Sequence, residues 1–378
     1  MSRESQMLQE LVQSSGIRKV NVVAWRDLDD PEAGGSELHA DEILRRWAAA
    51  GLVIESRTSA VAGYSSRIER HGYTINRRGG RYQIFPDAIF RGLFSRRANR
   101  PDAVVEIWNG MPFFSPIWYR GRRLVLLHHV HGEMWQMTLP GLLGRVGWII
   151  EHWLAPPFYR RTTIATLSNS SRDEIKERMH LHRIEVVPPG ISTTFLPGGE
   201  RSASPLVVAV GRLVPVKRFD LLIESFIEVR KAVPSATFVI VGDGYLRTEL
   251  EELIASHAAQ NWISLPGRIT DEELLSLYQR AWLVSSASLR EGWGMSLTEA
   301  AACGTPSVVV DIAGHRDAVD HGHSGLLVDK TELAMAISNV LRDDGMLERL
   351  RLGAFRHAQI FTWDSAALDL FRLILKNR

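Results

Sequence analysis

The stretch LVVAVGRLVPVKRFDLLIESFIEVRKAVPSATFVIVGDG, residues 206–244, decides the fold class of this chain. It begins and ends in short apolar runs, which are typical of strands buried on both faces of a parallel sheet. Between these runs, residues 217–233 show the apolar spacing of a helix that packs on such a sheet. A strand, a helix and a second strand of these lengths predict a βαβ unit with a right-handed crossover.

The same alternation continues along the chain on both sides of this unit. Downstream, we predict helices at residues 245–258, 271–280 and from about 295, separated by the apolar runs WISLPG, AWLVSSA, SVVVDIAG and GLLVD. Upstream, RKVNVVAW (18–25) precedes a helix that Ser36 is placed to cap and Gly51 to end. Further apolar runs follow there, LVIES, AVVEIW, RLVLLH, TIATLS and IEVVPPG. The pattern predicts an α/β fold of two doubly wound domains with parallel sheets.

The polar stretch LPGGERSASP (196–205) is the best candidate for a linker, because Gly, Pro and Ser favour irregular backbone. It divides the chain into a first domain, residues 1–200, and a second domain, residues 201–361. The amphipathic tail, residues 362–378, has no strand after it, so we expect it to cross back onto the first domain. Doubly wound domains bind ligands at the carboxyl ends of their strands, so we expect the two domains to face one central cleft.

The composition indicates a globular protein of a reducing compartment. A chain of 378 residues is too long for one ordinary core, and its single cysteine excludes an internal disulfide framework and a Cys-based metal site. That residue, Cys303, is predicted to be a small core side chain. No apolar run reaches the roughly 18–20 residues of a membrane helix, and the polar N-terminal segment contains no secretory apolar region. We therefore expect a cytoplasmic protein.

Residues 57–123 form a strongly basic segment, with 13 arginines against 4 acidic side chains. Such a segment attracts phosphates, nucleic acid or an anionic membrane leaflet, although a merely solvated basic surface is an equally good interpretation. No nucleic-acid-binding motif accompanies it, and apolar side chains lie between the arginines, so we favour a peripheral contact with an anionic membrane. These arginines include Arg77, Arg78, Arg81, Arg91, Arg96, Arg97, Arg100, Arg122 and Arg123; the apolar residues between them are Tyr82, Ile84, Phe85, Ile89, Phe90, Leu93 and Phe94.

Glycines and cations that follow predicted strands are candidates for a phosphate site. The pair Gly34-Gly35 precedes the first of the predicted helices, where backbone amides can approach an anion; a structural turn is the alternative. In the second domain, Gly211 ends a strand, and Arg212 and Lys217 flank the start of the next helix. Two cations and free amides at such a place would hold a diphosphate, although cations without a ligand are common in such loops.

The run LLHHVHG places three histidines at the end of a strand of the first domain. Alternation along the strand sends His128 and His129 to opposite faces. The trio with His131 resembles a metal cluster, but no carboxylate or cysteine partner is evident. We therefore favour one histidine that faces the cleft, and we predict no metal site.

The stretch LREGWGMSLTEAAACGTP (289–306) carries two carboxylates eight residues apart. If Gly294 marks the start of a helix, Glu299 lies in or near its first turn, where it can accept hydrogen bonds from the two hydroxyls of a ribose. The amides that follow Gly294 would face a phosphate. Glu291, on the preceding loop, could accept from the hydroxyls of a second group.

Several motifs in this order resemble the retaining glycosyltransferases of family 4, which have the two-domain GT-B fold. Glu291 and Glu299 match the E-x7-E signature of that family. The resemblance covers nearly the whole chain and is tighter in its second half. It is carried by AGGSELHADEI, VVPPGI, VGRLVPVKRFDLLIESF, VGDGYLRTELE, EGWGMSLTEAAACGTP, HSGLLVD and FTWDSAA.

The resemblance implies a role for each matched residue of the second domain. Arg212 and Lys217 match the cations that grip the donor diphosphate and stabilise the departing nucleotide. Glu299 matches the carboxylate that holds the ribose, and Glu291 the one that contacts the donor sugar. The phosphate site would be completed by the loop at Gly211 and by the backbone of Gly294, Met295, Ser296 and Leu297.

In the first domain, Gly35 or its neighbour Gly34 matches the loop that approaches the phosphates. His128 matches best the histidine that contacts the transferred sugar, with His131 as the second choice.

The implied activity is transfer of a sugar from a UDP- or GDP-sugar to a glycan or lipid-linked acceptor, as in the synthesis of cell-envelope polysaccharide. No cofactor is implied, and no divalent metal, because Arg212, Lys217 and amides supply positive charge and the Asp-x-Asp pattern of metal-dependent enzymes is missing. The family is thought to react on one face of the sugar; double displacement through a carboxylate is the rival scheme. A non-catalytic nucleotide-sugar-binding protein and a sugar-nucleotide epimerase are the alternatives on the same fold.

Overall fold

The structure is a computed structural model that describes residues 1–94, 100–132, 135 and 141–377. The described chain divides into two compact units. Unit 1 comprises Met1–Gly190 together with Thr362–Arg378, and unit 2 comprises Ile191–Phe361. Each unit is built on its own sheet, of eight strands in unit 1 and six in unit 2, so the prediction of two doubly wound α/β domains is confirmed.

The first unit ends at Gly190, before the polar stretch 196–205 that the sequence indicated as a linker. Local packing sets this limit. A Cβ at Gly190 would lie 2.1 Å from the backbone nitrogen of Trp363, so the chain closes tightly on the C-terminal helix of unit 1. The next residue, Ile191, instead donates its amide to the carbonyl of Phe361 in unit 2, at 3.1 Å. The composition of the chain does not predict these two contacts, because each joins residues that are far apart in the sequence.

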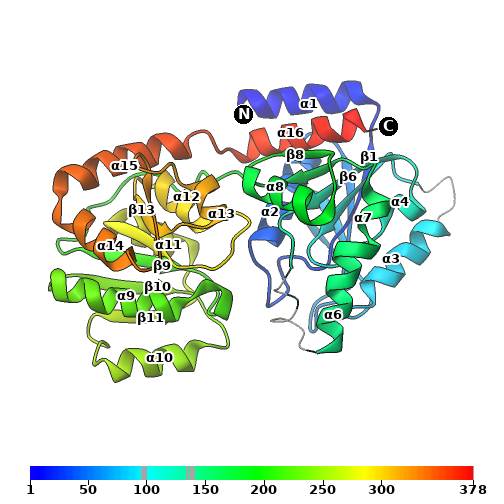
Figure 1. Ribbon diagram of the computed structural model, residues 1–378. Helices are drawn as coiled ribbons and strands as arrows, with labels where there is room; N and C mark the ends of the chain where they lie inside the picture. Colours follow the sequence, from blue (N-terminus) through cyan, green and yellow to red (C-terminus); the bar gives the residue numbers. More distant parts are fainter. Residues whose placement is uncertain (95–99, 133–134, 136–140, 378) are drawn as a thin grey trace. The chain divides into compact units, whose positions relative to one another are not determined.

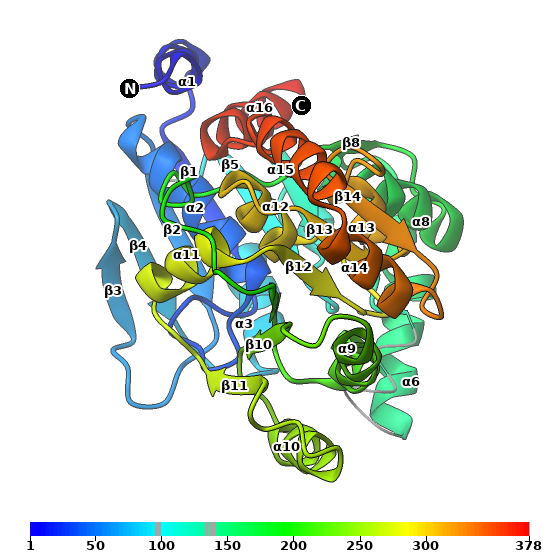
Figure 2. The same cartoon turned by 90° about the vertical axis from the view of Figure 1, so that its left-hand side faces the viewer.

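The sheet of unit 1 has the strand order β3-β4-β2-β1-β5-β6-β7-β8. Its strands are β1 (Lys19–Val23), β2 (Val53–Thr58), β3 (Arg67–Arg70), β4 (Tyr73–Arg77), β5 (Ala103–Trp108), β6 (Arg122–Leu127), β7 (Ile164–Thr166) and β8 (Ile184–Val186). The sequence predicted a parallel sheet, but β3 pairs antiparallel with β4. His71 and Gly72 connect them with φ of 48° and 84°, the positive angles that a tight hairpin turn requires. Figure 2 shows this pair at the edge of the sheet.

Helices cover the sheet of unit 1, and the C-terminal helix is one of them. They are α1 (Arg3–Ser15), α2 (Gly35–Ala49), α3 (Ile84–Leu93), α4 (Ser115–Trp118), α6 (Leu142–Ile149), the π-helical turn η2 (Ile150–Leu154), α7 (Pro156–Tyr159), α8 (Asn169–Met179) and α16 (Trp363–Lys376). Helix α16 packs on α1 and α2, so the first and last helices of the chain lie side by side (Figure 1). Phe371 is fully buried, and Trp47 donates its indole N–H to the carbonyl of Ala367 at 2.8 Å.

Unit 2 has a wholly parallel sheet in the order β11-β10-β9-β12-β13-β14. Its strands are β9 (Leu206–Val210), β10 (Thr237–Val241), β11 (Ile263–Gly267), β12 (Leu283–Ser286), β13 (Ser307–Val310) and β14 (Gly325–Val328). Its helices are η3 (Pro215–Lys217), α9 (Phe219–Ala232), α10 (Arg247–Ser256), α11 (Asp271–Arg280), α12 (Met295–Ala302), α13 (Ala313–Ala318), α14 (Leu333–Arg342) and α15 (Asp344–Ala358).

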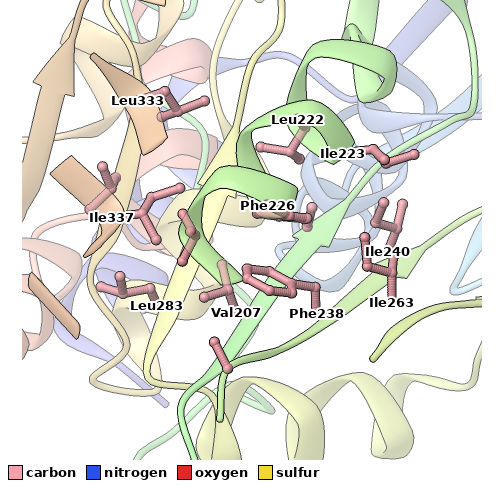
Figure 3. Close-up of a cluster of buried hydrophobic side chains, with 14 of the residues drawn as sticks. Val207, Leu222, Ile223, Phe226, Phe238, Ile240, Ile263, Leu283, Leu333 and Ile337 are labelled. Carbon is pink, nitrogen blue, oxygen red and sulfur yellow. The ribbon is translucent and has the colours of Figure 1, made fainter. Parts of the chain in front are cut away.

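The core of unit 2 lies between its sheet and helices α9 and α14. Phe226 of α9 stacks on Phe238 of β10, with ring centroids 4.0 Å apart, and Val207 of β9 lies beside them (Figure 3). Cys303 is buried, as the sequence predicted, and its burial raises the pKa of the thiol to about 12. This core fixes the strand ends from which the loops of the candidate site extend.

Candidate active site

The loop after β9 is held by close packing against the loop after β10. The amide of Gly211 donates to the carbonyl of Val241 at 3.0 Å. Gly242 has a φ of 135°, and a Cβ there would lie 1.9 Å from the carbonyl oxygen of Gly211. Only glycine permits this approach. The run VGDG therefore fixes the loop that carries Arg212, whose side chain is exposed.

Lys217 and Glu291 form an ion pair within unit 2. Lys217 ends the short helix η3, and Glu291 lies on the loop between β12 and α12. Ser288 donates its hydroxyl to the same carboxylate oxygen, at 2.8 Å. Burial favours the neutral carboxyl group, but Lys217 and His315 hold the pKa of Glu291 below its usual value. The pair is therefore ionised, and an anionic ligand would compete with Glu291 for the cation.

The first turn of α13 completes the surroundings of Glu291, and the sequence did not predict its role there. A Cβ at Gly314 would lie 2.2 Å from the carbonyl oxygen of Glu291, so glycine is required for the two loops to meet. The neighbouring His315 is buried, and its Nδ1 donates to the carbonyl of Val310 at 2.7 Å. The glycine that ends the apolar run SVVVDIAG and the histidine that follows it were the available signal, since ligands bind at such strand ends.

Glu299 lies deeper in its helix than the sequence predicted. Gly294 is the N-cap of α12, and the helix begins at Met295, so Glu299 is in the second turn. The hydroxyl of Tyr278 donates to Oε2 of Glu299 at 3.4 Å. Burial raises the pKa of Glu299 to about 7; the Tyr278 hydrogen bond opposes this shift and Asp271 adds to it. Burial therefore favours the protonated carboxyl group of Glu299 more than it is favoured in a solvent-exposed glutamate.

Two of the three amides predicted for the phosphate site remain available in the first turn of α12. Met295 and Ser296 have no carbonyl one turn before them within the helix. Leu297 donates instead to the carbonyl of Gly294, at 2.9 Å. A phosphate at this helix end would therefore be bound by the amides of Met295 and Ser296, with the helix dipole adding to them.

The glycine pair of unit 1 begins helix α2, but the helix N-terminus already holds a carboxylate. Gly34 is the N-cap, in place of the predicted Ser36, because Glu37 folds back to accept the Gly34 amide at 2.8 Å. Ser36 lies inside the helix and donates to the same carboxylate at 3.0 Å. Gly35 is exposed, and a ligand phosphate there would share the helix end with Glu37.

The three histidines after β6 have different surroundings. His128 is only 4% exposed, and its Nε2 lies 3.2 Å from Nδ1 of His39 on α2. Burial holds the pKa of His128 well below its usual value, so the ring is neutral. His129 and His131 are partly exposed and stack, with centroids 4.8 Å apart. Among the described residues, no three His, Cys, Asp or Glu side chains come together as metal ligands would.

Part of the basic segment 57–123 is neutralised inside unit 1. Arg77 is buried and pairs with Asp27 and Asp29, and Arg81 pairs with Glu32. Arg91 donates to both carboxylate oxygens of Asp87, at 3.0 Å each. Arg96 and Arg97 lie outside the described residues. Acidic residues of the loop between β1 and α2, and one of α3, thus neutralise cations that the sequence assigned to the surface.

Helices α6 and α7 (Figure 1) and the turn η2 between them carry an exposed apolar surface. We call it the α6 surface; Leu142 is 75% exposed and Trp153 is 70% exposed. Its other large apolar members are Leu143, Val146, Trp148, Ile149, Leu154 and Phe158. Within the described ranges, no helix combines the length and apolar character needed to cross a bilayer.

Each half of the chain matches a known protein family. Residues 33–195 match the family described as Glycosyltransferase Family 4, and residues 194–356 match the family described as Glycosyl transferases group 1. The two matches adjoin and together span most of the chain.

Individual proteins give the same result. The D-inositol 3-phosphate glycosyltransferase of Thermobispora bispora is 26% identical over 93% of this chain and 94% of its own length. The enzyme of the same name from Nocardia farcinica is 28% identical, over 64% of this chain and 64% of its own length. A solved structure, Anabaena Alr3699/HepE in complex with UDP and glucose, superposes with a TM-score of 0.73 at 18% identity, covering 94% of this chain and 98% of that one. The likeness confirms the GT-B fold predicted from the sequence.

Proposed function

We propose that this chain, which belongs to the glycosyltransferases of group 1 and family 4, moves a sugar from a UDP- or GDP-sugar to a glycan or lipid-linked acceptor. Membership makes it a glycosyltransferase that takes its sugar from a nucleotide sugar. The anomeric configuration is retained in this proposal.

The observation that carries the proposal is the ionised Lys217–Glu291 pair, on loops at one end of the sheet of unit 2. Breaking the bond between a sugar and a diphosphate builds negative charge on the phosphate. Lys217 turns from Glu291 to this phosphate, and Arg212 of the same β9–α9 connection adds a second cation. Glu291, relieved of its cation, accepts hydrogen bonds from the hydroxyls of the donor sugar.

The reaction proceeds on one face of the sugar and without a metal ion. Two cations and the amides of Met295 and Ser296 supply the positive charge that a divalent ion supplies in other transferases. The departing phosphate takes the proton of the acceptor hydroxyl, so neither Glu291 nor Glu299 acts as a nucleophile. A trapped glycosyl ester on either glutamate would support double displacement instead.

The ribose of the donor is held by Glu299, whose half-buried carboxyl group lies in α12. As an acceptor it can bind two adjacent hydroxyls at once. UDP is the first nucleotide to test, because the structurally similar Anabaena protein binds UDP. GDP remains the alternative.

Unit 1 is proposed to contribute Gly34, Gly35 and one histidine to the donor site. The sequence favoured His128 for the contact with the transferred sugar. Since His128 is buried against His39 and His131 is partly exposed, we place this contact on His131. A larger loss of transfer in His128→Ala than in His131→Ala, at unchanged stability, would reverse this assignment.

The acceptor is proposed to be part of the synthesis of cell-envelope polysaccharide or glycolipid, with the enzyme peripheral on the cytoplasmic face of the membrane. The α6 surface supports this more directly than the arginines of residues 57–123, several of which are paired. The relatives are named for D-inositol 3-phosphate, so inositol phosphates belong in the acceptor screen.

The test combines nucleotide binding with transfer. UDP, GDP and ADP are compared by thermal shift with and without Mg²⁺, and release of nucleotide from the matching sugar conjugate is then followed with acceptors. Lys217→Gln is expected to lower the rate of transfer by about 10²–10³ in a protein that remains folded. Lys231→Gln, an exposed cation of α9 that also pairs with a glutamate, is the matched control.

Three outcomes separate this proposal from its alternatives. Nucleotide binding without transfer or hydrolysis would indicate a non-catalytic binding protein. Conversion of the free nucleotide sugar into its epimer would indicate an epimerase. Equal rates in Lys217→Gln and the wild type would exclude the assigned role of Lys217.

A further inference from the structure

An arginine-lined cavity of about 490 Å³ opens on unit 1, and none of the residues assigned to the donor lines it. Five arginines line it, together with Ser66 and Asn76; the arginines are Arg57, Arg67, Arg77, Arg78 and Arg91. Four of them lie in β2, β3, β4 and α3, and Arg78 directly follows β4. The three strands lie at one edge of the sheet (Figure 2). Arg57 and Arg77 are at the carboxyl ends of β2 and β4, the side of a parallel sheet where ligands bind.

Two of the five arginines have their charge compensated within the fold. The guanidinium of Arg77 forms ion pairs with Asp27 and Asp29, and Arg91 is paired with Asp87. For Arg57, Arg67 and Arg78, no carboxylate of the described residues lies within 4.0 Å. Three cations at this cavity are therefore left without an anion.

Arg57 is the most constrained of these three, because its side chain is half-buried. Burial lowers the pKa of Arg57, and repulsion from Arg91 and Arg78 lowers it further, against the opposing effect of Asp87 and Glu55. Glu55 is itself paired with Lys19, at 2.9 Å. Holding a partly desolvated guanidinium beside like charges costs stability, and such costs are typical of binding sites.

We propose that this cavity is a binding site for the phosphate group of a ligand, separate from the phosphate site of the donor. A guanidinium binds phosphate through two parallel N–H donors, so Arg57 and Arg78 can each hold a pair of its oxygens. A phosphate monoester carries a charge of about −1.5 to −2 at neutral pH, which offsets most of the excess positive charge. Ser66 and Asn76 add neutral hydrogen-bond donors.

The phosphate can belong to a soluble phosphorylated molecule or to the headgroup of an anionic lipid. Both present the same group to the arginines, and only the remainder of the ligand differs. The phosphate site can be tested independently of the proposed function, because phosphate binding is measured on the protein alone and without a sugar donor.

The test measures binding of inorganic phosphate and glycerol 3-phosphate by calorimetry and thermal shift, in chloride buffers of matched ionic strength. Arg57→Gln and Arg78→Gln are each expected to weaken phosphate binding about tenfold or more, as loss of a charge-assisted hydrogen bond does. Arg57→Gln should also raise the melting temperature without phosphate, because a half-buried like charge is removed. Arg3→Gln, an exposed arginine of α1 with the same change of charge, should leave both quantities unchanged.

A structural role alone would give a different result. Arg57→Gln would then lower the melting temperature, and phosphate would protect the variant as much as the wild type; this pair of results overturns the proposal. Equal phosphate binding in all four proteins also overturns it. A shift with UDP that survives in Arg57→Gln shows that the donor site is intact, so the two proposals fail separately.

The source of the phosphate is resolved in a second arm. Vesicles of phosphatidylglycerol and of phosphatidylcholine are compared in flotation with the wild type and Arg57→Gln. Loss of phosphatidylglycerol binding in the variant assigns the site to a lipid headgroup. Unchanged flotation together with weakened glycerol 3-phosphate binding assigns it to a soluble phosphorylated ligand.

Discussion

Glu299 shows how a single carboxyl group is set by its surroundings. The signature E-x7-E places it near a ligand, but the structure shows that burial raises its pKa to about 7. The folded protein therefore binds this proton more tightly than the unfolded chain does, for which the ordinary value of 4.5 applies. The resulting stability is fully present below about pH 4.5 and is lost as the pH rises through about 7.

Because the pKa of Glu299 is raised in the folded protein, we predict that stability falls as the pH rises. Between pH 5 and pH 8 and without nucleotide, the wild type should lose on the order of 1–3 kcal/mol of stability relative to Glu299→Gln, whose amide does not titrate. Urea unfolding of the two proteins across this range measures the difference. Glu272→Gln, an exposed glutamate of α11, is the control; a difference independent of pH would contradict the raised pKa.

Individual residues of the candidate site could be predicted from the sequence, but their contacts with one another could not. It identified Lys217 and Glu291 separately, one for phosphate and one for sugar, but not as partners. His315 and Gly314 were not identified at all, because their contact with Glu291 depends on two loops that meet only in the folded sheet. The sequence shows which residue types follow a predicted strand. It does not show which residues of another loop they contact in the folded protein.

At the scale of elements, α6 and η2 stand out because the sequence analysis made no prediction for them. Their apolar residues would suit a core, yet the structure leaves many of them exposed. The exposed charges in this segment, Arg145, Arg160 and Arg161, are all basic, and its one carboxylate, Glu151, is fully buried. An apolar helix face bordered by cations suits the interface of an anionic bilayer.

The double variant Leu142→Ser/Trp153→Ser is expected to weaken binding to phosphatidylglycerol vesicles at least about tenfold, since each exposed side chain would bury apolar surface worth about 1.5–3 kcal/mol in the membrane. Co-sedimentation at several lipid concentrations measures this loss. Met335→Ser, which replaces an apolar residue of α14 that is 59% exposed, should bind as the wild type does. Equal binding of all three proteins would remove the α6 surface from the membrane contact.

At the scale of the whole molecule, the chain returns at its C-terminus to complete the unit in which it began. Helix α16 packs on α1 and α2, and Arg46 of α2 pairs with Asp364 at 2.6 Å. His39, which contacts His128, is also covered by Trp363, with centroids 5.5 Å apart. The surroundings of His39 and His128 therefore depend on Trp363, near the end of the chain.

Phe371→Ala tests this dependence. The side chain is fully buried against Trp47, so its removal should lower the free energy of unfolding by about 3–5 kcal/mol. Urea unfolding measures the loss, and hydrogen exchange should place it in unit 1. Arg372→Ala, an exposed neighbour on the same helix, should change stability by less than about 0.5 kcal/mol. A loss in Phe371→Ala as small as the one expected for Arg372→Ala would mean that α16 contributes little through its buried face.

Apolar periodicity and glycine positions are local properties of the chain, so the alternation of strands and helices, the two-sheet fold and the family could be predicted from the sequence. Helix α11, predicted at 271–280, has those bounds in the structure. The tertiary structure alone decided charge and exposure: Arg77 is neutralised by Asp27, His128 is buried against His39, and Lys217 is paired with Glu291. Each of these outcomes depends on desolvation and on partners far away in the sequence, which only packing brings together.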